Sequence, residues 1–290
     1  MDIKIIDFIK NRKAYYSFSV ALIVVSVFAL SFWGLNLGIE FSGGSVLEAE
    51  YSDERPPISE IEERLGDDAY VRAIGEKGVL VRTTSSDEES YNRIISALQG
   101  AEEKYFESIG PSVGKELTNR SLLAILIASL LVIIYVALSF RGEELIKPGK
   151  YGVIAVSVAI LHDMLIVLGI FSVLGYLYEV QMTIPIAVAL LTTLGYSIND
   201  TVVVFDRVRE NLEKGTEKKF YNIVNRSLTQ TLGRSLATSF TTIIVLTSIL
   251  FFGGTTLFYF ALALIIGIAL GTYSSIFLAG PLLFTLTKDK

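Results

Sequence analysis

The sequence predicts an α-helical integral membrane protein with six transmembrane helices and one small α+β domain outside the membrane. Of the 290 residues, 51% are hydrophobic, and the mean hydropathy is +0.53, as in chains with several membrane spans. Six apolar runs are each long enough to cross the hydrocarbon core, which takes about 20 helical residues. One long hydrophilic segment separates the first two runs, and it supplies the α+β domain.

The six predicted helices cover residues 15–37, 119–140, 152–176, 182–205, 231–251 and 257–286. The first helix follows the basic stretch KNRK, as the apolar part of a signal peptide would. Its apolar part is too long for a signal peptide, however, and no small-residue cleavage site follows it. We therefore expect a retained anchor. Pro185, near the start of the fourth helix, is expected to bend that helix.

Basic residues indicate the orientation in the membrane. Lysines and arginines gather before the first helix, in the loops at 141–151 and 206–230, and at Lys288 and Lys290 after the sixth helix. With six spans these four segments lie on one side, which the positive-inside rule makes cytoplasmic. We therefore predict a multi-pass protein of the cytoplasmic membrane. Residues 1–37 form a cytoplasmic N-terminus and the first helix, residues 38–118 are extracytoplasmic, and residues 119–290 end at a cytoplasmic C-terminus.

The segment 38–118 holds 18 acidic and 8 basic residues, which argues against nucleic acid as a partner. Its pattern predicts strands and helices in mixed order: a strand at 45–51, a helix at 57–65, a hairpin of strands at 69–75 and 78–84, and a helix at 87–107. Ser59 and Glu62 suggest a capping box for the first of these helices. Since the chain has no cysteine, the domain is expected to lack disulfides.

Four ionisable residues fall within the predicted spans, namely His162, Asp163, Asp200 and Arg234. A charge at the membrane centre costs at least about 2.5 to 3.5 kcal/mol, so such residues usually face a bundle interior or a water-filled path. At a rise of about 1.5 Å per residue, Asp200 and Arg234 reach similar depths in the inner leaflet. His162 and Asp163 fall closer to the midplane. Asp163 and Asp200 are therefore expected at different depths.

Polar side chains form one stripe on each of two consecutive antiparallel helices. The stripe on the fourth helix follows the spacing i, i+3, i+4, i+7 and consists of Thr193, Tyr196, Ser197 and Asp200. The stripe on the fifth helix consists of Ser227, Gln230, Thr231, Arg234, Thr238 and Thr241. Each stripe contains one charge, and the two charges have opposite signs. We therefore expect the stripes to face each other and Asp200 and Arg234 to be partners.

Two interpretations of this pair remain open. A buried ion pair could fix the helix register, with serine and threonine hydroxyls satisfying one another across the interface. Alternatively, Asp200 is a protonatable carboxylate whose charge Arg234 controls, and the hydroxyls order water along a proton route. The length of the stripes favours the second interpretation, because a register lock needs fewer polar side chains.

His162 and Asp163 point about 100° apart, and their role is open between a satisfied interhelical hydrogen bond and a relay. His162 shares its face with small residues that suit close helix contact, namely Ala155, Ala159 and Gly169. One histidine with one aspartate is too little for a metal site. A small-xxx-small series on the sixth helix indicates close packing rather than chemistry: Gly267, Gly271, Ser275 and Ala279.

Enzyme chemistry finds little support in the sequence. It contains no phosphate-binding glycine loop, no HExxH, no cysteine nucleophile and no G-x-S-x-G elbow. Intramembrane aspartyl chemistry would need two facing carboxylates, which the expected depths of Asp163 and Asp200 disfavour. We therefore expect no enzyme, no cofactor and no metal. The protein should move something across the membrane or support a partner that does.

Six segments resemble the SecD/SecF family, in order and over nearly the whole chain: GIEFSGGSVLE, SIGPSVGKEL, LHD, GYSINDTVVVFDRVREN, TLGRSLATSFTT and GTYSSIFLAGPLL. The first contains an aromatic-x-Gly-Gly signature at Phe41, Gly43 and Gly44. FSGG alone is weakly specific, but the blocks of the fourth and fifth helices are highly specific together. They resemble SecF more than SecD. The segment 38–118 resembles the family by layout more than by residues.

The resemblance implies membership in the resistance-nodulation-division superfamily, with six helices and a ferredoxin-like extracytoplasmic domain called P1. It implies SecD as a partner, expected here as a separate chain, together with the Sec channel, a translocating preprotein and membrane lipid. It further implies that the complex pulls on the emerging preprotein and uses a proton gradient, or in some organisms a sodium gradient. Asp200 and Arg234 match positions of the ion-conducting site, and we assign Asn199, Thr238 and Thr241 to the same site.

The hypothesis that follows is a cycle of protonation at Asp200. Protonation would weaken the attraction to Arg234, let the fourth and fifth helices shift against SecD, and move P1 through the first helix and a hinge at Phe41, Gly43 and Gly44. A plain turn at FSGG is an equal alternative to the hinge. There are two alternatives for the function of the chain: a non-conducting scaffold subunit, or half of a small-molecule transporter of the same superfamily.

Overall fold

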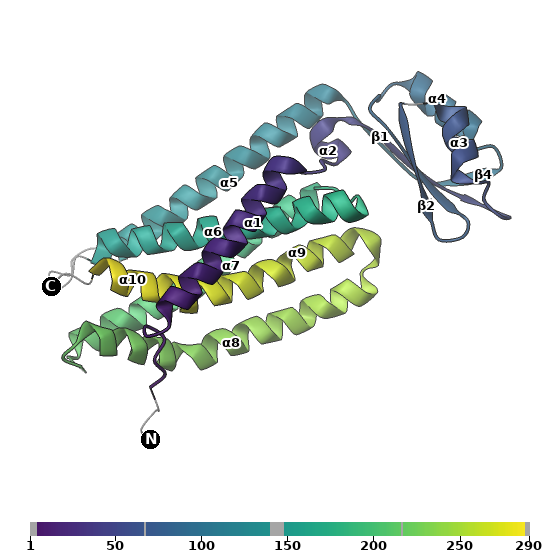
Figure 1. Ribbon diagram of the computed structural model, residues 1–290. Coiled ribbons are helices and arrows are strands. Elements are labelled where there is room, and N and C mark those ends of the chain that lie inside the picture. The colour runs from purple at the N-terminus through teal and green to yellow at the C-terminus, as the bar shows by residue number, and fades with distance from the viewer. Residues whose placement is uncertain (1–4, 67, 140–147, 216, 288–290) are drawn as a thin grey trace. The chain divides into compact units, whose positions relative to one another are not determined.

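The computed structural model describes residues 5–66, 68–139, 148–215 and 217–287. Most of the loop predicted at 141–151, as well as Lys288 and Lys290, lies outside these residues. The chain forms two compact units (Figure 1). We call Leu37–Leu123 with Gln181–Thr183 the sheet unit, and the rest of the described chain the helical unit.

Six helices among the described residues are long and apolar enough to cross a membrane, which confirms the predicted number. They are α1 (Arg12–Phe32), α5 (Pro111–Ser139), α6 (Pro148–Tyr178), α7 (Ile184–Glu213), α8 (Phe220–Phe252) and α9 (Gly254–Tyr273). The last span continues through a π-helical segment, η1 (Ser274–Ala279), into α10 (Gly280–Thr287). Pro185 lies in the first turn of α7, where a proline removes no helical hydrogen bond, so the expected bend has no cause.

Helix α7 lies at the centre of the helical unit, with α6, α8, α9 and η1 packed against it. The core between these helices is apolar and includes Val156, Leu194, Val204, Leu228 and Ile276. Only 6% of the most apolar stretch of α5 is buried within the chain, against 56% for α7. The outer helices therefore offer most of their surface to lipid or to another membrane protein.

Small residues let the helices of this unit approach closely, as the sequence predicts. A Cβ atom added to Gly267 would lie 2.3 Å from Thr193 Cγ2, and one added to Gly271 would lie 3.0 Å from the Cα atom of Ser197. The small-residue series of the sixth span thus packs directly on the polar face of α7. A Cβ on Gly169 would lie 2.3 Å from Ser26 Cβ, so the small face of α6 packs against α1.

The sheet unit is a small α+β domain with the order βαββαβ. After a short helix α2 (Ile39–Ser42) it consists of β1 (Gly44–Tyr51), α3 (Ile58–Leu65), β2 (Ala69–Ile74), β3 (Gly78–Thr83), α4 (Glu88–Ala97) and β4 (Ala101–Ile109). The strands pair antiparallel in the spatial order β2-β3-β1-β4. This is the ferredoxin-like arrangement that was expected. Its core joins both helices to one face of the sheet and includes Leu47, Ile61, Val79, Val81 and Ile94.

The predicted helix at 87–107 is wrong in its second half. Helix α4 ends at Ala97, Gly100 follows with φ +87°, and β4 then pairs with β1 through contacts such as Phe106 opposite Leu47. Burial of Phe106 against the domain core overrides the helix preference of the Glu and Lys residues in this segment. The predicted capping box is also wrong, because α3 begins at Ile58 and Ser59 lies inside it.

The FSGG segment is tightly packed within the sheet unit. Gly43 has φ 78° and Gly44 has φ 118°, values that favour glycine. A Cβ on Gly43 would lie 2.9 Å from Pro111 Cα, and one on Gly44 would lie 2.2 Å from the Thr83 carbonyl oxygen. The carbonyl oxygen of Phe41 accepts a hydrogen bond from Thr118 Oγ1 on α5 at 3.2 Å. Movement at this predicted hinge would first have to break these contacts.

The N-terminal residues before α1 are docked on the start of α8. The carboxylate of Asp7 accepts hydrogen bonds from the Tyr221 hydroxyl and, at 3.0 Å, from Asn225 Nδ2. The backbone N–H of Ile9 donates to Asn225 Oδ1 at 3.1 Å. The hydrogen bond from Tyr221 holds the pKa of Asp7 below its usual 3.8.

We expect docking of this segment to weaken in acid. Because the pKa of Asp7 is lowered in the docked state, the contribution to docking is fully present above pH 3.8 and is lost as the pH falls through the lowered pKa. Hydrogen exchange of the Ile9 amide, corrected for intrinsic rates, measures the effect. The Asp7→Asn variant should show weaker protection at neutral pH and no such pH dependence. An identical pH dependence in that variant would mean that a group other than Asp7 causes it.

Candidate functional site

Asp163 on α6 is buried and fully engaged in hydrogen bonds. Its Oδ1 atom lies 2.8 Å from His162 Nδ1. Its Oδ2 atom accepts hydrogen bonds from Ser197 Oγ on α7 at 2.6 Å and from Ser274 Oγ on η1 at 2.8 Å. Asp163 is 3% exposed and His162 0%. Helix α7 and the segment η1 thus each supply a hydroxyl donor to one carboxyl group of α6 in the middle of the bundle.

The π-helical segment η1 makes this arrangement possible. Ser274 and Ser275 are adjacent, and both are completely buried. Ser274 donates to Asp163, whereas the Ser275 hydroxyl lies 2.7 Å from Thr201 Oγ1 on α7. In a regular α-helix, neighbouring residues point about 100° apart. The wider turn of a π-helix, which occurs often at functional sites, lets both serine hydroxyls point into the bundle interior.

Asp200 lies three residues after Ser197, on the same buried face of α7, and is 4% exposed. The hydroxyls of Ser235 on α8 and Thr272 on α9 are its polar neighbours. Among the described residues, however, Asp200 Oδ2 and Ser235 Oγ have no hydrogen-bond partner. Ser239 Oγ lies 2.5 Å from Thr272 Oγ1, so the polar contacts continue along α8 and α9. Of the polar stripe predicted on the fourth helix, Thr193, Ser197 and Asp200 are buried, and Tyr196 is half-buried.

Asp163 and Asp200 are close in depth, and the expectation of different depths is wrong. The hydrogen bond between Ser197 and Asp163 places Asp163 within about one helical turn of Asp200 along α7. The error came from the predicted helix ends: α7 continues to Glu213 instead of ending near residue 205. Both aspartates therefore stand near the middle of their helices.

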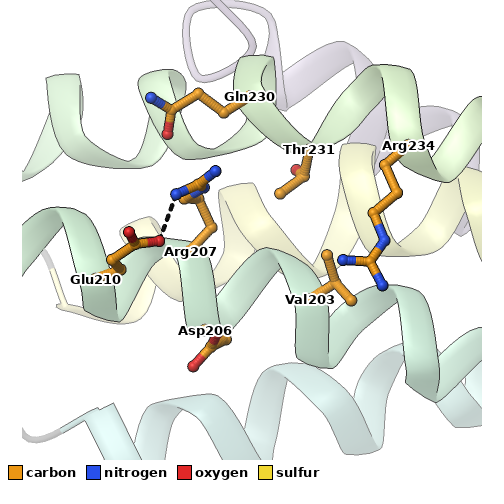
Figure 2. A pocket seen from close by; sticks show the side chains of 7 residues that line it. All are labelled: Val203, Asp206, Arg207, Glu210, Gln230, Thr231 and Arg234. Atoms are coloured by element: carbon orange, nitrogen blue, oxygen red, sulfur yellow. Dashed lines mark hydrogen bonds and ion pairs between the residues drawn. The ribbon is translucent and has the colours of Figure 1, made fainter.

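Arg234 is not a direct partner of Asp200 in this structure, so that prediction is wrong for the chain by itself. Its side chain is exposed and lines a pocket of about 230 Å³ between α7 and α8. Figure 2 shows the Arg234 side chain reaching from α8 toward α7, beside Val203. The other residues that line the pocket are Asp206, Arg207, Glu210, Gln230 and Thr231, with Arg207 paired to Glu210. Arg234 affects Asp200 only as a charge acting over a distance.

The other residues assigned to the site lie on the outer surface with Arg234. Asn199, Thr238 and Thr241 are exposed. The Thr238 and Thr241 hydroxyls donate to backbone carbonyls of their own helix, at 3.0 Å in both cases. The face of α8 that meets Asp200 is the neighbouring one, with Thr231, Ser235 and Ser239 buried.

Sequence reasoning missed Ser235, Ser239, Thr272 and Ser274 as neighbours of the two aspartates. The spacing of Ser227, Thr231, Ser235 and Ser239 every four residues was a usable signal for a second polar face on α8. The prediction placed the neighbouring face, which contains Arg234, against α7, because a charged residue within a span usually faces the bundle interior or a water-filled path. The part played by Ser274 depends on the π-helical turn, which has no comparable pattern.

Comparisons with known proteins agree with the fold. The model of the C-terminal part of the protein export membrane proteins SecD/SecF matches residues 91–289, and the SecD/SecF GG motif matches residues 28–54. Protein translocase subunit SecF of Thermobaculum terrenum is 40% identical, covering 96% of this chain and 93% of that protein. The same subunit of Pseudomonas aeruginosa is 36% identical, covering 99% of this chain and 94% of that protein.

Two solved structures have a similar fold. SecDF of Thermus thermophilus, described as a translocon-associated membrane protein, matches with a TM-score of 0.85 and 30% identity over 99% of this chain. SecDF in a form called super-membrane-facing matches with a TM-score of 0.72 and 30% identity over 98% of this chain. The chain spans 39% of the length of each of these two proteins.

Proposed function

The chain belongs to the SecD/SecF family of protein-export membrane proteins, and we propose that it acts as the SecF subunit of an ion-driven complex that assists Sec-dependent export. Its relatives are subunits of protein translocase, and its six spans make it a multi-pass membrane protein. In this proposal the membrane is the cytoplasmic membrane, both termini are cytoplasmic, and residues 38–118 form the extracytoplasmic P1 domain. The partners are SecD as a separate chain, the Sec channel and the translocating preprotein.

The observation that carries the proposal is the buried carboxyl group of Asp200. Its Oδ2 atom has no hydrogen-bond partner in the part of the chain that the structure describes. An ionised carboxylate in such a place is strongly unfavourable unless it is paired, and the cost is avoided when the group binds a proton or a cation. Asp200 is therefore suited to take up and release an ion as its surroundings change.

The position of Arg234 next to Ser235 on α8 supports a movement that changes the surroundings of Asp200. Ser235, the next residue on α8, is the one that now faces the carboxyl group. A rotation of α8 by the angle between neighbouring residues, about 100°, would bring Arg234 toward Asp200 in place of Ser235. The most apolar stretch of α8 has few contacts that hold it in one orientation, since 17% of that stretch is buried within the chain. We propose that ion binding at Asp200 and this movement are coupled.

The exposed polar strip on the helical unit supports SecD as the partner. It consists of Asn199 on α7 and of Arg234, Thr238 and Thr241 on α8. An arginine that faces lipid at this depth is unfavourable, whereas a second membrane protein can offer it a polar or acidic partner. We propose that SecD covers this strip and completes the site.

The connection between α6 and α7 provides a path from the two aspartates to the P1 domain. Residues Gln181–Thr183 of this connection belong to the sheet unit. There the N–H group of Gly38 donates to the Met182 carbonyl oxygen at 2.8 Å, and Leu37 forms a parallel bridge with Met182. Since α6 contains Asp163 and α7 contains Asp200, a movement of either helix would reach the segment that leads into the FSGG turn.

We expect Gly38→Pro to uncouple export from ion flow. Gly38 has φ −70°, which proline also adopts, so the substitution removes the N–H donor to Met182 without straining φ. Gradient-dependent export should fall while ion flux through the complex continues. Gly38→Ala keeps the donor; its Cβ would lie 2.3 Å from Glu40 Oε2, the end of a flexible side chain, and 3.1 Å from the Met182 oxygen, so its effect should be smaller. Gly110→Ala is the control, because a Cβ there meets no atom within 4 Å; an equal loss in that variant would refute the path.

Gradient-dependent export with Asp200→Asn tests the proposed function, with co-purification of SecD measured in parallel. A complex that assembles normally but no longer responds to the gradient supports coupling at Asp200. If Asp200→Asn and Arg234→Ala both export normally, and export falls only when the subunit is omitted, the chain is a non-conducting scaffold.

A further inference from the structure

The adjacent residues His162 and Asp163 form a buried acid–base pair that the proposed function at Asp200 does not use. The Nδ1 atom of His162 lies 2.8 Å from Asp163 Oδ1. The other oxygen of Asp163 accepts two hydroxyl hydrogen bonds, from Ser197 and Ser274. Asp163 acts as an acceptor in both of these hydroxyl hydrogen bonds. The proton of the imidazole ring therefore belongs on Nδ1, where it completes the set of donors.

The far nitrogen of the ring is then a buried proton acceptor. His162 Nε2 has no hydrogen-bond partner among the residues that the structure describes, and the side chain is completely buried. The ring stacks on Tyr273, with 5.9 Å between the ring centroids. A purely structural histidine gains most when both nitrogens are satisfied. Here one nitrogen is bonded to a carboxylate and the other keeps a free lone pair.

The charge of the pair favours proton uptake at that lone pair. With a neutral ring, the pair has a net charge of −1 inside the membrane region; with a proton on Nε2, it is neutral overall. Other titratable groups at this depth, on elements that pack against α6, are Asp200 and Tyr196 on α7, Tyr273 on α9, and Tyr15 and Tyr16 on α1. The segments η1 and α10 contain none. Arg234, which acts on Asp200, is on the outer face of α8.

The position of Ser197 joins this pair to Asp200. Ser197 donates to Asp163 and lies three residues before Asp200 on the same face of α7. Among the described residues, His162 Nε2 and Asp200 Oδ2 both lack a hydrogen-bond partner. Ser197 is bonded to the carboxyl group that His162 contacts and lies one helical turn before Asp200. Resting on the proposed function, we infer that His162 and Asp163 form a second proton-holding site in series with Asp200.

The proton steps at this second site balance as follows. An N–H bond forms at Nε2 while the Nδ1–H bond breaks and an O–H bond forms at Asp163 Oδ1, which leaves both the ring and the carboxyl group neutral. On release toward Asp200, the O–H bond of Asp163 breaks as an O–H bond forms at Ser197 Oγ. The original Ser197 O–H bond breaks, and its proton forms an O–H bond at the Asp200 carboxylate. The ring then returns from the Nε2–H form to the Nδ1–H form. No oxidant, reductant or other reactant is needed.

The test is proton flux as a function of pH in vesicles that contain the complex with the His162→Asn variant. The asparagine amide can still donate to Asp163, as Nδ1 does, but it has no counterpart of Nε2 and does not titrate. We expect assembly to be normal, flux to fall by about tenfold or more, and its pH profile to lose one limb. Asp163→Asn should lower flux similarly, and Asp163→Glu should restore part of it.

Ser172→Ala is the matched control for a structural effect. Ser172 is also buried on α6, and its hydroxyl donates to the Ala29 carbonyl oxygen at 2.9 Å, but it does not titrate. This variant should change the amount of assembled complex at most, with an unchanged pH profile per complex. If His162→Asn behaves like Ser172→Ala or like the unmodified complex while Asp200→Asn blocks flux, the second site is refuted and the proposed function stands. If Asp200→Asn also conducts normally, both fail.

Discussion

Asp200→Asn is expected to abolish the gradient-dependent part of export while the fold of the helical unit is retained. Asparagine has nearly the same shape as aspartate and keeps polar contact with Ser235 and Thr272, but it cannot gain or lose a proton at this position. Replacing a buried carboxyl group that has an unpartnered oxygen by a neutral amide also removes a desolvation cost. The variant should therefore be at least as stable as the original chain.

Export of a preprotein into vesicles, with and without a collapsed ion gradient, measures this effect. Glu213→Gln on the same helix is the control, because Glu213 is exposed and paired with Arg209 at 3.1 Å. This control should respond to the gradient like the unmodified complex. A normal gradient response by Asp200→Asn, in complexes that contain SecD, would show that the carboxyl group does not couple ion flow to export.

Gly44→Ala is expected to destabilise the sheet unit by about 3 kcal/mol or more. Gly44 has φ 118°, a backbone conformation that residues with a side chain rarely adopt. A Cβ there would lie 2.2 Å from the Thr83 carbonyl oxygen of β3. Since that oxygen belongs to the backbone of a central strand, it cannot move aside without disturbing the strand pairing. Gly43→Ala should have a similar effect through Pro111, whose Cα would lie 2.9 Å from the new Cβ. Hydrogen exchange of amides in β1 and β3 gives the free energy of unfolding.

Two other glycines separate the causes of this loss. Gly66 has φ 77° and ψ −177°, nearly the backbone conformation of Gly43, but a Cβ there meets no atom within 4 Å. Gly66→Ala should therefore report backbone strain alone, about 1 to 3 kcal/mol. Gly110→Ala, with neither positive φ nor close neighbours, should have little effect. Equal losses in Gly44→Ala and Gly66→Ala would mean that the contact with Thr83 contributes nothing.

The spans and most of the sheet unit could be predicted because their signals are local. Runs of about 20 apolar residues indicate a membrane span directly, and alternation in β1 and β3 indicates a half-buried strand. Strand β4 escaped prediction because its acidic sequence has no such alternation, and only pairing with β1 makes it a strand. The ends of α7 were misplaced because the helix continues into charged residues, where hydropathy gives no signal.

The site was only half predictable for a related reason. Periodicity correctly places Thr193, Ser197 and Asp200 on one buried face of α7. On α8, two adjacent faces are polar, and periodicity cannot tell which one meets α7 and which one meets another protein. Burial shows that Ser235 faces inward and Arg234 outward. The importance of Asp163 was hidden because its partners come from α7 and from the π-helical turn.

Ion flux across vesicles that contain the purified complex, with protons and sodium ions measured separately, tests the central claim most directly. The claim is that Asp200 binds the ion whose flow drives export. The complex with unmodified Asp200 should conduct one of the two ions when a gradient is imposed. The same complex with Asp200→Asn, assembled with SecD in equal amount, should give the flux of empty vesicles. An unchanged flux in that variant would contradict the claim.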